Sequence, residues 1–254
     1  IHTIVSLLVR DCGIAFLYEA AVEQEIRQGL LKEIRLDDEY VRIGAAVTFT
    51  QALESSLIPP LMKEAVSRIA APAIRNAGTF GGNIGNGSAK ADSVLIHFVA
   101  DAKVRLVSLK GERIVDIGQF YKGRKALDLA SDELIAEVLL PRTGLENYYY
   151  KKVGGRNALA ISRVSFAGLI VMNGDVIRHI AAAFGAVSGT VLRMRDLEKM
   201  FEGKTLAEAK ACKDDILSLY ASRMELTRGR VSAEYRKAVC MNLLKDFLEE
   251  KGIS

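Results

Sequence analysis

The stretch from Ile74 to Ser88 constrains what this chain can fold into, because half of the positions from Gly78 to Gly87 are glycine. A glycine loses more backbone entropy on folding than any other residue, so this density requires a reason. One reason is a close approach of backbone N–H groups to a phosphate or to the polar edge of a ring, with short side chains such as Thr79 adding hydrogen bonds. A glycine-rich structural crossover explains the same composition, and the residues alone leave both interpretations open.

Several common kinds of site are excluded by spacing. The glycines match neither a P-loop, which needs Gly-Lys-Ser/Thr, nor a dinucleotide fingerprint that opens a helix after a strand. Cys12, Cys212 and Cys240 lie far apart and form no Cys-x-x-Cys pair, so no zinc ribbon or iron–sulfur cradle is expected. His97, in an apolar helix, and His179, in a strand, have no metal-ligand neighbours, so we interpret them as packed or surface histidines.

The composition is typical of a globular protein. The chain has 254 residues, 50% of them hydrophobic, and a formal net charge of +4. Positive charges are spread along the sequence, which argues against nucleic-acid binding, since that function needs a clustered basic face. No apolar run approaches the roughly 20 residues that span a bilayer, so no membrane contact is expected. Sparse, widely separated cysteines suit a reducing compartment, and we expect a cytoplasmic protein.

Apolar periodicity and turn signals predict the order of the helices and strands. Thr48 and Gln51 resemble a capping box, and Pro59-Pro60 suits the first turn of a helix. Further helices are predicted at residues 19–31, 92–100, 206–211, 214–221 and 233–250, and residues 71–88 are predicted to be irregular. Strands are predicted at 41–47, 103–108, 113–117, 133–140, 148–153, 164–172 and 176–184.

The glycine-rich stretch resembles a known cofactor loop. The pattern Ala71-Pro-x-Ile-Arg-Asn-x-Gly-Thr-Phe-Gly-Gly-Asn-Ile-x-Asn-x-Ser, followed by Asp92, is similar to the flavin loop of the FAD-binding subunits of molybdenum hydroxylases. That family includes xanthine dehydrogenase, the carbon monoxide dehydrogenase medium subunit and hydroxybenzoyl-CoA reductase. Residues 41–45, 149–156, 184–188 and 232–236 resemble further family signatures in the same order, so the resemblance covers about residues 41–254.

This resemblance implies an architecture and a division into domains. It implies an α+β chain in which residues 1–145 form an FAD-binding type-2 (PCMH-like) α/β domain. Residues 146–254 would form a C-terminal domain like that of CO dehydrogenase flavoproteins, with a three-stranded antiparallel sheet and helices. The residues themselves also place a change of pattern near position 145, where strands followed by helices indicate a sheet with helices on one face.

The resemblance also implies a set of cofactor-binding residues. Without it, Lys152 is a solvated lysine on an edge strand, and Asp92 is a helix N-terminal residue favoured by the macrodipole. The resemblance implies that the flavin and its diphosphate are approached by Thr79, Gly81, Gly82 and Asn83. It implies that the ribityl or pyrophosphate region is touched by Ser88 and Asp92, and that Lys152 lies near the isoalloxazine.

The implied activity is electron relay. FAD would receive electrons from iron–sulfur clusters in one partner subunit, after a molybdenum-cofactor subunit oxidises the substrate, and would pass them to NAD⁺ or another acceptor. The chain contains no evident metal-ligand set of its own, so the clusters and the molybdenum would belong to the partners. A hetero-oligomeric oxidoreductase is therefore expected.

One segment departs from the family pattern. Relatives normally carry a second, Ala-Gly-Gly-Thr-like flavin loop near the N-terminus, but Gly13 and Gly29 are the only glycines in residues 1–40. Residues 13–22 and 29–34 instead resemble the effector domain of LysR-type regulators, so residues 1–37 are interpreted as a foreign segment. Ala160 also stands where an acidic residue is often seen. The alternatives left open are a non-catalytic scaffold subunit with a degraded FAD site and a stand-alone flavin reductase.

Overall fold

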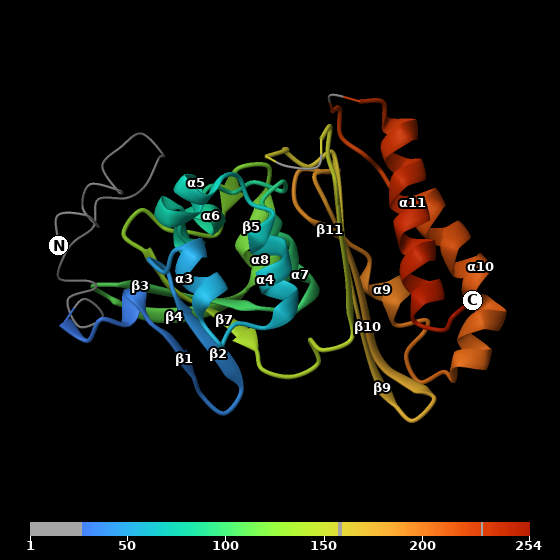
Figure 1. Cartoon of the computed structure of the whole chain (residues 1–254), viewed down its shortest axis with the longest axis horizontal. Helices are drawn as coiled ribbons and strands as arrows, with labels where there is room; N and C mark the ends of the chain where they lie inside the picture. Colours follow the sequence, from blue (N-terminus) through green and yellow to red (C-terminus); the bar gives the residue numbers. More distant parts are fainter. Residues whose placement is uncertain (1–26, 157–158, 230) are drawn as a thin grey trace.

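The computed structural model describes residues 27–156, 159–229 and 231–254, and Figure 1 shows two layered parts side by side. The N-terminal part is built on a five-stranded antiparallel sheet in the order β1-β2-β7-β3-β4. Its strands are β1 (Ile34–Leu36), β2 (Tyr40–Gly44), β3 (Lys103–Ser108), β4 (Gly111–Asp116) and β7 (Leu134–Pro141).

Helices cover one face of this sheet. They lie mainly in the crossover between β2 and β3, and the first begins at the predicted capping box, because Thr48 and Gln51 satisfy each other's backbone N–H groups. The helices are α3 (Phe49–Glu54), α4 (Pro60–Ser67), α5 (Pro72–Ala77), α6 (Phe80–Gly85), α7 (Asp92–Val99) and the later α8 (Ile117–Phe120). A 3₁₀ turn, η2 (Leu30–Lys32), precedes β1, and β5 (Tyr121–Gly123) pairs with β6 (Ala126–Leu127).

The prediction that residues 71–88 are irregular was wrong, since α5 and α6 occupy most of this stretch. Pro72 opens α5 as its first residue, and Thr79 caps α6 by accepting from the backbone N–H of Gly82. Glycine is unfavourable inside a helix, but packing overrides that preference at Gly81. A Cβ there would lie 2.6 Å from the Cβ of Ala45, so only glycine allows α6 to approach the end of β2.

The C-terminal part is a four-stranded antiparallel sheet in the order β11-β10-β9-β8. Its strands are β8 (Tyr148–Val153), β9 (Val164–Asn173), β10 (Val176–Gly185) and the short β11 (Leu192–Arg193). The first three agree with the sequence prediction, and β11 adds a fourth. The predicted hairpin at Asn173-Gly174 joins β9 to β10, with Gly174 at φ +62°.

Three helices belong to this C-terminal part: α9 (Arg195–Glu198), α10 (Leu206–Arg223) and α11 (Ala233–Glu250). The last has the predicted bounds. The prediction of two helices at 206–211 and 214–221 was wrong, because α10 is continuous and no glycine or proline interrupts it. Most of the predicted helix at 19–31 lies outside the described residues. In the described part of the chain, no helix is long and apolar enough to cross a membrane.

The C-terminal sheet is buried on both faces. Alternate residues of β9 and β10 point to opposite sides: Ala167 and Ala183 pack with the N-terminal helices, whereas Phe166 and Phe184 pack under α10 and α11. Contacts of α7 with β9 and β10 bring the two parts together. The apolar core of the N-terminal part therefore continues across the boundary onto the inner face of the second sheet.

His97 lies in the last turn of α7 and is fully buried, as a packed histidine. Its ring meets Phe80 edge to face at 5.8 Å between centroids, and neither ring nitrogen has a hydrogen-bond partner within the described residues. Burial lowers its pKa from the ordinary 6.5 to about 3, because a charged ring cannot be solvated there. The imidazole is therefore neutral in the folded protein at physiological pH.

This burial predicts an acid-dependent loss of stability. Because the folded-state pKa of His97 is depressed, the unfolded chain binds the proton more readily, and stability falls as pH drops below about 6.5. Between about pH 7.5 and about pH 5.5, the native protein should lose roughly 1.4 kcal/mol more of its free energy of unfolding than the His97→Phe variant. Urea denaturation at both pH values measures this, and equal losses would contradict the assignment.

Candidate functional site

The glycine motif forms the first turn of α6. The backbone N–H groups at this helix start all have partners within the chain: Phe80 donates to Val47 O (3.1 Å), Gly81 to Ala45 O (2.8 Å) and Gly82 to Thr79 Oγ1 (3.1 Å). A helix N-terminus ordinarily offers such groups to an anion. Here they bind α6 to the segment that follows β2 and to the capping side chain of Thr79. A ligand would therefore meet the side chains and the open surface of α6 instead.

The surroundings of Gly81 and Gly82 differ in the space that they leave for a side chain. Gly81 is fixed by its contact with Ala45, as described above. Gly82 is exposed, and a Cβ on it would meet only Thr79 Oγ1, at 3.0 Å, within 4 Å. The packing of the described chain therefore leaves the space beside Gly82 open, which fits the close approach of a ligand.

Asn83 links this turn to the next helix. Ser93, in α7, donates from its hydroxyl to Oδ1 of Asn83 at 2.7 Å. This bond uses the amide oxygen and orients the amide nitrogen of Asn83 as a free donor within the described part of the chain. Asn83 thus keeps an unused amide donor at the position that follows Gly82 in the chain.

Asp92 and Lys152 form a nearly buried ion pair across the two parts of the molecule. Lys152 Nζ lies 2.6 Å from Asp92 Oδ2, and each side chain is 8% exposed. Lys152 also donates to the backbone oxygen of Arg68 (2.9 Å), and the hydroxyl of Ser162 donates to Asp92 Oδ1 (3.0 Å). Both oxygens of the carboxylate are therefore held by residues from the C-terminal part.

Burial dominates the titration of this carboxyl group. Desolvation raises the pKa of Asp92 above its ordinary value, and the charge of Lys152 and the hydrogen bonds from Lys152 and Ser162 lower it only in part. The positive charge of Lys152 is therefore balanced by Asp92, and the ion pair holds α7 against β8. The interpretation of Lys152 as a solvated edge-strand lysine is excluded by its burial.

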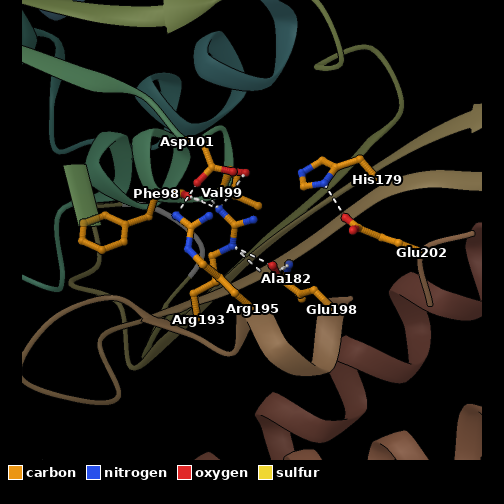
Figure 2. Close-up of polar contacts among 9 residues, drawn as sticks. All are labelled: Phe98, Val99, Asp101, His179, Ala182, Arg193, Arg195, Glu198 and Glu202. Atoms are coloured by element: carbon orange, nitrogen blue, oxygen red, sulfur yellow. Dashed lines mark hydrogen bonds and ion pairs between the residues drawn. The ribbon is translucent and has the colours of Figure 1, made fainter. Parts of the chain in front are cut away.

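A second network ties the other end of α7 to the same sheet (Figure 2). Arg193, in β11, donates through Nη1 to the backbone oxygen of Phe98 (2.7 Å) and lies 2.7 Å from an oxygen of Asp101. Its Nε contacts the buried carboxylate of Glu198 at 2.9 Å, and Glu198 also accepts from the backbone N–H of Ala182. Helix α7 is therefore fixed to the C-terminal sheet at both ends.

Ser88 lines a pocket of about 750 Å³ between the two parts, which the other predicted residues do not line, although Ser162, the partner of Asp92, does. We call this the basic pocket, because none of its described lining residues is acidic and seven are basic. These are Lys90, Arg124, Lys125, Arg156, Arg163, Arg228 and Arg236. Sequence reasoning missed them, since they come from separate segments that no spacing rule connects. It also missed Ser93 and Ser162, whose roles depend on tertiary contacts.

Comparison with known proteins identifies the class. A family described as the FAD binding domain in molybdopterin dehydrogenase matches residues 26–143, and one described as the CO dehydrogenase flavoprotein C-terminal domain matches residues 148–251. The fold and the glycine-containing turn thus define an oxidoreductase component with a flavoprotein architecture.

Similar proteins narrow this class. The xanthine dehydrogenase FAD-binding subunit of Escherichia coli O157:H7 is 31% identical over 84% of this chain and 75% of that protein. The nicotinate dehydrogenase FAD-subunit of Eubacterium barkeri is 28% identical over 85% of the chain and 75% of its own length. A solved CO dehydrogenase from Oligotropha carboxidovorans matches with a TM-score of 0.78 and 26% identity, covering 87% of this chain and 78% of that one. The chain belongs to the family of FAD-binding subunits of molybdenum hydroxylases, which confirms the predicted resemblance.

The residues around Gly82 fit a cofactor of this kind in space and in donor chemistry. The open face of Gly82 admits a close approach, and Asn83 presents an amide donor. No group of three or more His, Cys, Asp or Glu side chains among the described residues could hold a metal ion.

Removal of one partner tests the Asp92–Lys152 pair. Lys152→Met should lower the free energy of unfolding by roughly 3–5 kcal/mol, because it leaves a nearly buried carboxylate without its counter-charge. The double variant Asp92→Asn/Lys152→Met should lose less than Lys152→Met alone. Lys151→Met, at the exposed neighbouring position, is the matched control and should stay within about 0.5 kcal/mol of the native protein. A Lys152→Met protein as stable as this control would show that the pair contributes little.

Proposed function

We propose that this chain binds FAD beside α6 and relays electrons from iron–sulfur clusters in a partner subunit to NAD⁺ or another acceptor. The observation that carries the proposal is the open face of Gly82, within a chain of the FAD-binding family. Asn83, the next residue, adds an amide donor that no described residue uses. When bound, FAD supplies a centre that accepts electrons and passes them on in pairs.

Each predicted residue would contribute in a different way. The backbone at Gly82 would lie against the cofactor, and Thr79 and Asn83 would offer a hydroxyl and an amide. Gly81 would act indirectly, by allowing α6 to pack on Ala45. These roles use surfaces that the internal hydrogen bonds of α6 leave available.

Asp92 and Lys152 would act as a pair. Lys152 carries a positive charge whose position is set by Asp92 and by the carbonyl of Arg68. Such a held charge would favour negative charge developing on a nearby reduced ring, although its effect is diminished by the carboxylate that it contacts. Ser88 would contribute from the basic pocket, where its hydroxyl accepts a bond from the backbone N–H of Lys90.

Partner subunits would supply the remaining redox centres. We propose an iron–sulfur subunit and a molybdenum-cofactor subunit in a cytoplasmic hetero-oligomer. Support comes from relatives named as subunits, such as the carbon monoxide dehydrogenase medium chain of Hydrogenophaga pseudoflava. The absence of a metal-ligand cluster in the described part of this chain is compatible with that division of labour.

A scaffold role is the second candidate, and one observation favours it. The first N–H groups of α6 are already bonded within the chain, and Lys152 is already paired. A subunit that no longer held FAD could keep both arrangements for assembly alone. The flavin absorption spectrum of the purified native protein separates the candidates, because only the electron-relay role requires bound flavin.

A branched side chain at Gly82 tests the cofactor surface. Gly82→Val should abolish most of the visible flavin absorbance, because the added methyl groups occupy the space beside α6. Its matched control is Gly118→Val, which places the same side chain on an exposed helical glycine of α8. Both variants should show similar thermal unfolding. Full flavin content in folded Gly82→Val protein would contradict the assignment.

Gentle purification from the native source tests the proposed assembly. The chain should elute together with proteins that contain iron, acid-labile sulfide and molybdenum, which elemental analysis of the same fractions detects. Removal of the partners with high salt should leave the flavin on this chain and the metals on the other fractions. A chain that transfers electrons at full rate while alone in solution would instead support a stand-alone flavin reductase.

A further inference from the structure

The end of α7 contains an aspartate in a backbone conformation that favours glycine. Asp101, two positions beyond the last helical residue, has φ +53°, which is the left-handed conformation that commonly ends a helix at a glycine. The helix ends in the ordinary way, because the backbone N–H of Ala102 donates to the backbone oxygen of His97 at 2.9 Å. Aspartate tolerates this conformation better than most residues, but glycine adopts it at a lower cost. A reason for aspartate is therefore expected in its side chain.

Two arginines of the C-terminal part bind the carboxylate of Asp101 (Figure 2). Arg193 Nη1 lies 2.7 Å from Asp101 Oδ1, and Arg195 Nη2 forms an ion pair with the same oxygen. The side chain of Arg193 is 4% exposed, whereas that of Arg195 is 52% exposed. Because water screens an exposed ion pair, the contact with Arg193 should fix Asp101 more firmly than the contact with Arg195.

Arg193 is itself held by the C-terminal sheet. Its Nε lies 2.9 Å from Oε1 of Glu198, a carboxylate that also accepts from the backbone N–H of Ala182 in β10 at 2.8 Å. On the other side, Nη1 donates to the backbone oxygen of Phe98 at 2.7 Å. A planar guanidinium can span contacts in two directions, which a single ammonium cannot. Arg193 thus sets the distance between the last turn of α7 and β10.

The first turn of α7 holds two groups on the proposed cofactor side. Asp92 binds the ammonium of Lys152 at 2.6 Å, and Ser93 donates to the amide oxygen of Asn83 at 2.7 Å. The helix has eight residues, and all of them are buried. A short helix with internal hydrogen bonds moves as one body, and close-packed surroundings transmit its displacement. A shift at the last turn of α7 therefore reaches Asp92 and Ser93.

We propose that Asp101 and Arg193 are positioning residues for the cofactor surface and act through α7. Their contacts set the position of this helix along its axis, and its first turn then fixes the amide of Asn83 and the ammonium of Lys152. The effect on FAD rests on the proposed function, whereas the orientation of Asn83 follows with or without flavin. The same role accounts for an aspartate at a position where glycine would end the helix at a lower conformational cost.

Asp101→Gly tests the carboxylate. This variant keeps the helix end and relieves the left-handed strain, so it should fold, but α7 loses its ion pairs with the C-terminal part. FAD titrated into flavin-stripped protein should bind roughly 10-fold more weakly than it binds the native chain, because small misplacements of binding groups are costly. Asp101→Asn retains an acceptor oxygen and should bind FAD more tightly than Asp101→Gly.

Arg195→Gln is the matched control, because it removes the exposed partner of the same carboxylate and does not alter the contacts of Arg193. It should keep the native dissociation constant for FAD. Arg193→Lys keeps a positive charge beside Glu198 but cannot span both sets of contacts, so it should weaken FAD binding as Asp101→Gly does. Native FAD affinity in folded Asp101→Gly and Arg193→Lys proteins would show that the two residues contribute only to stability, and would overturn the proposal.

The side-chain amide of Asn83 gives a second readout that needs no flavin. In protein with isotopically labelled asparagine, its NMR signal is identified by its absence from Asn83→Ala protein. The signal should shift in Asp101→Gly and Arg193→Lys toward its position in Ser93→Ala, and should stay native in Arg195→Gln. An unchanged signal in both variants would overturn the positioning role. Failure of the native protein to bind FAD would instead contradict the proposed function, and the Asn83 signal would then decide the positioning role.

Discussion

The rest of the structure depends on the burial of α7 between the two parts of the molecule. All residues of this helix are buried, so its apolar side chains contact the N-terminal helices on one side and strands β9 and β10 on the other. Asp92 anchors its first turn through Lys152, and Arg193 binds the carbonyl of Phe98 at its last turn. A helix without an exposed face cannot move alone, so the two sheets keep one relative placement. The relative placement of the two sheets determines the surfaces that residues of both parts line together, such as the basic pocket.

The burial of α7 between the two parts changes the roles expected of the predicted site residues. Asp92 and Lys152 form an ion pair that joins the two parts. Any effect of this pair on a cofactor would depend on where it fixes the two parts as much as on the charge of Lys152. Gly81 is explained by its contact with Ala45, whereas Gly82 retains an open face. A single glycine-rich stretch thus contains one glycine fixed by packing and one with an open face, whereas the sequence presented a structural crossover and a ligand surface as alternatives.

The distribution of positive charge illustrates the same dependence. Along the sequence the basic residues are dispersed, and this argued against any clustered basic face. In the fold, segments near Lys90, Arg124, Arg163 and Arg228 meet around one pocket, because α7 holds the N-terminal loops against the C-terminal sheet. The result is a single pocket lined by basic residues and not an extended stripe. The gathering of positive charge in this chain is therefore a property of the boundary between its two parts.

The sequence alone determined the family, most helices and strands, and the capping box at Thr48, because these depend on local periodicity, turn chemistry and a motif read in order. It could not determine that residues 71–88 form helices, since glycine disfavours a helix locally and only the contact of Gly81 with Ala45 reverses that preference. Nor could it pair Asp92 with Lys152, which are 60 positions apart. Such contacts depend on which segments the fold brings together. The tertiary structure alone decided them.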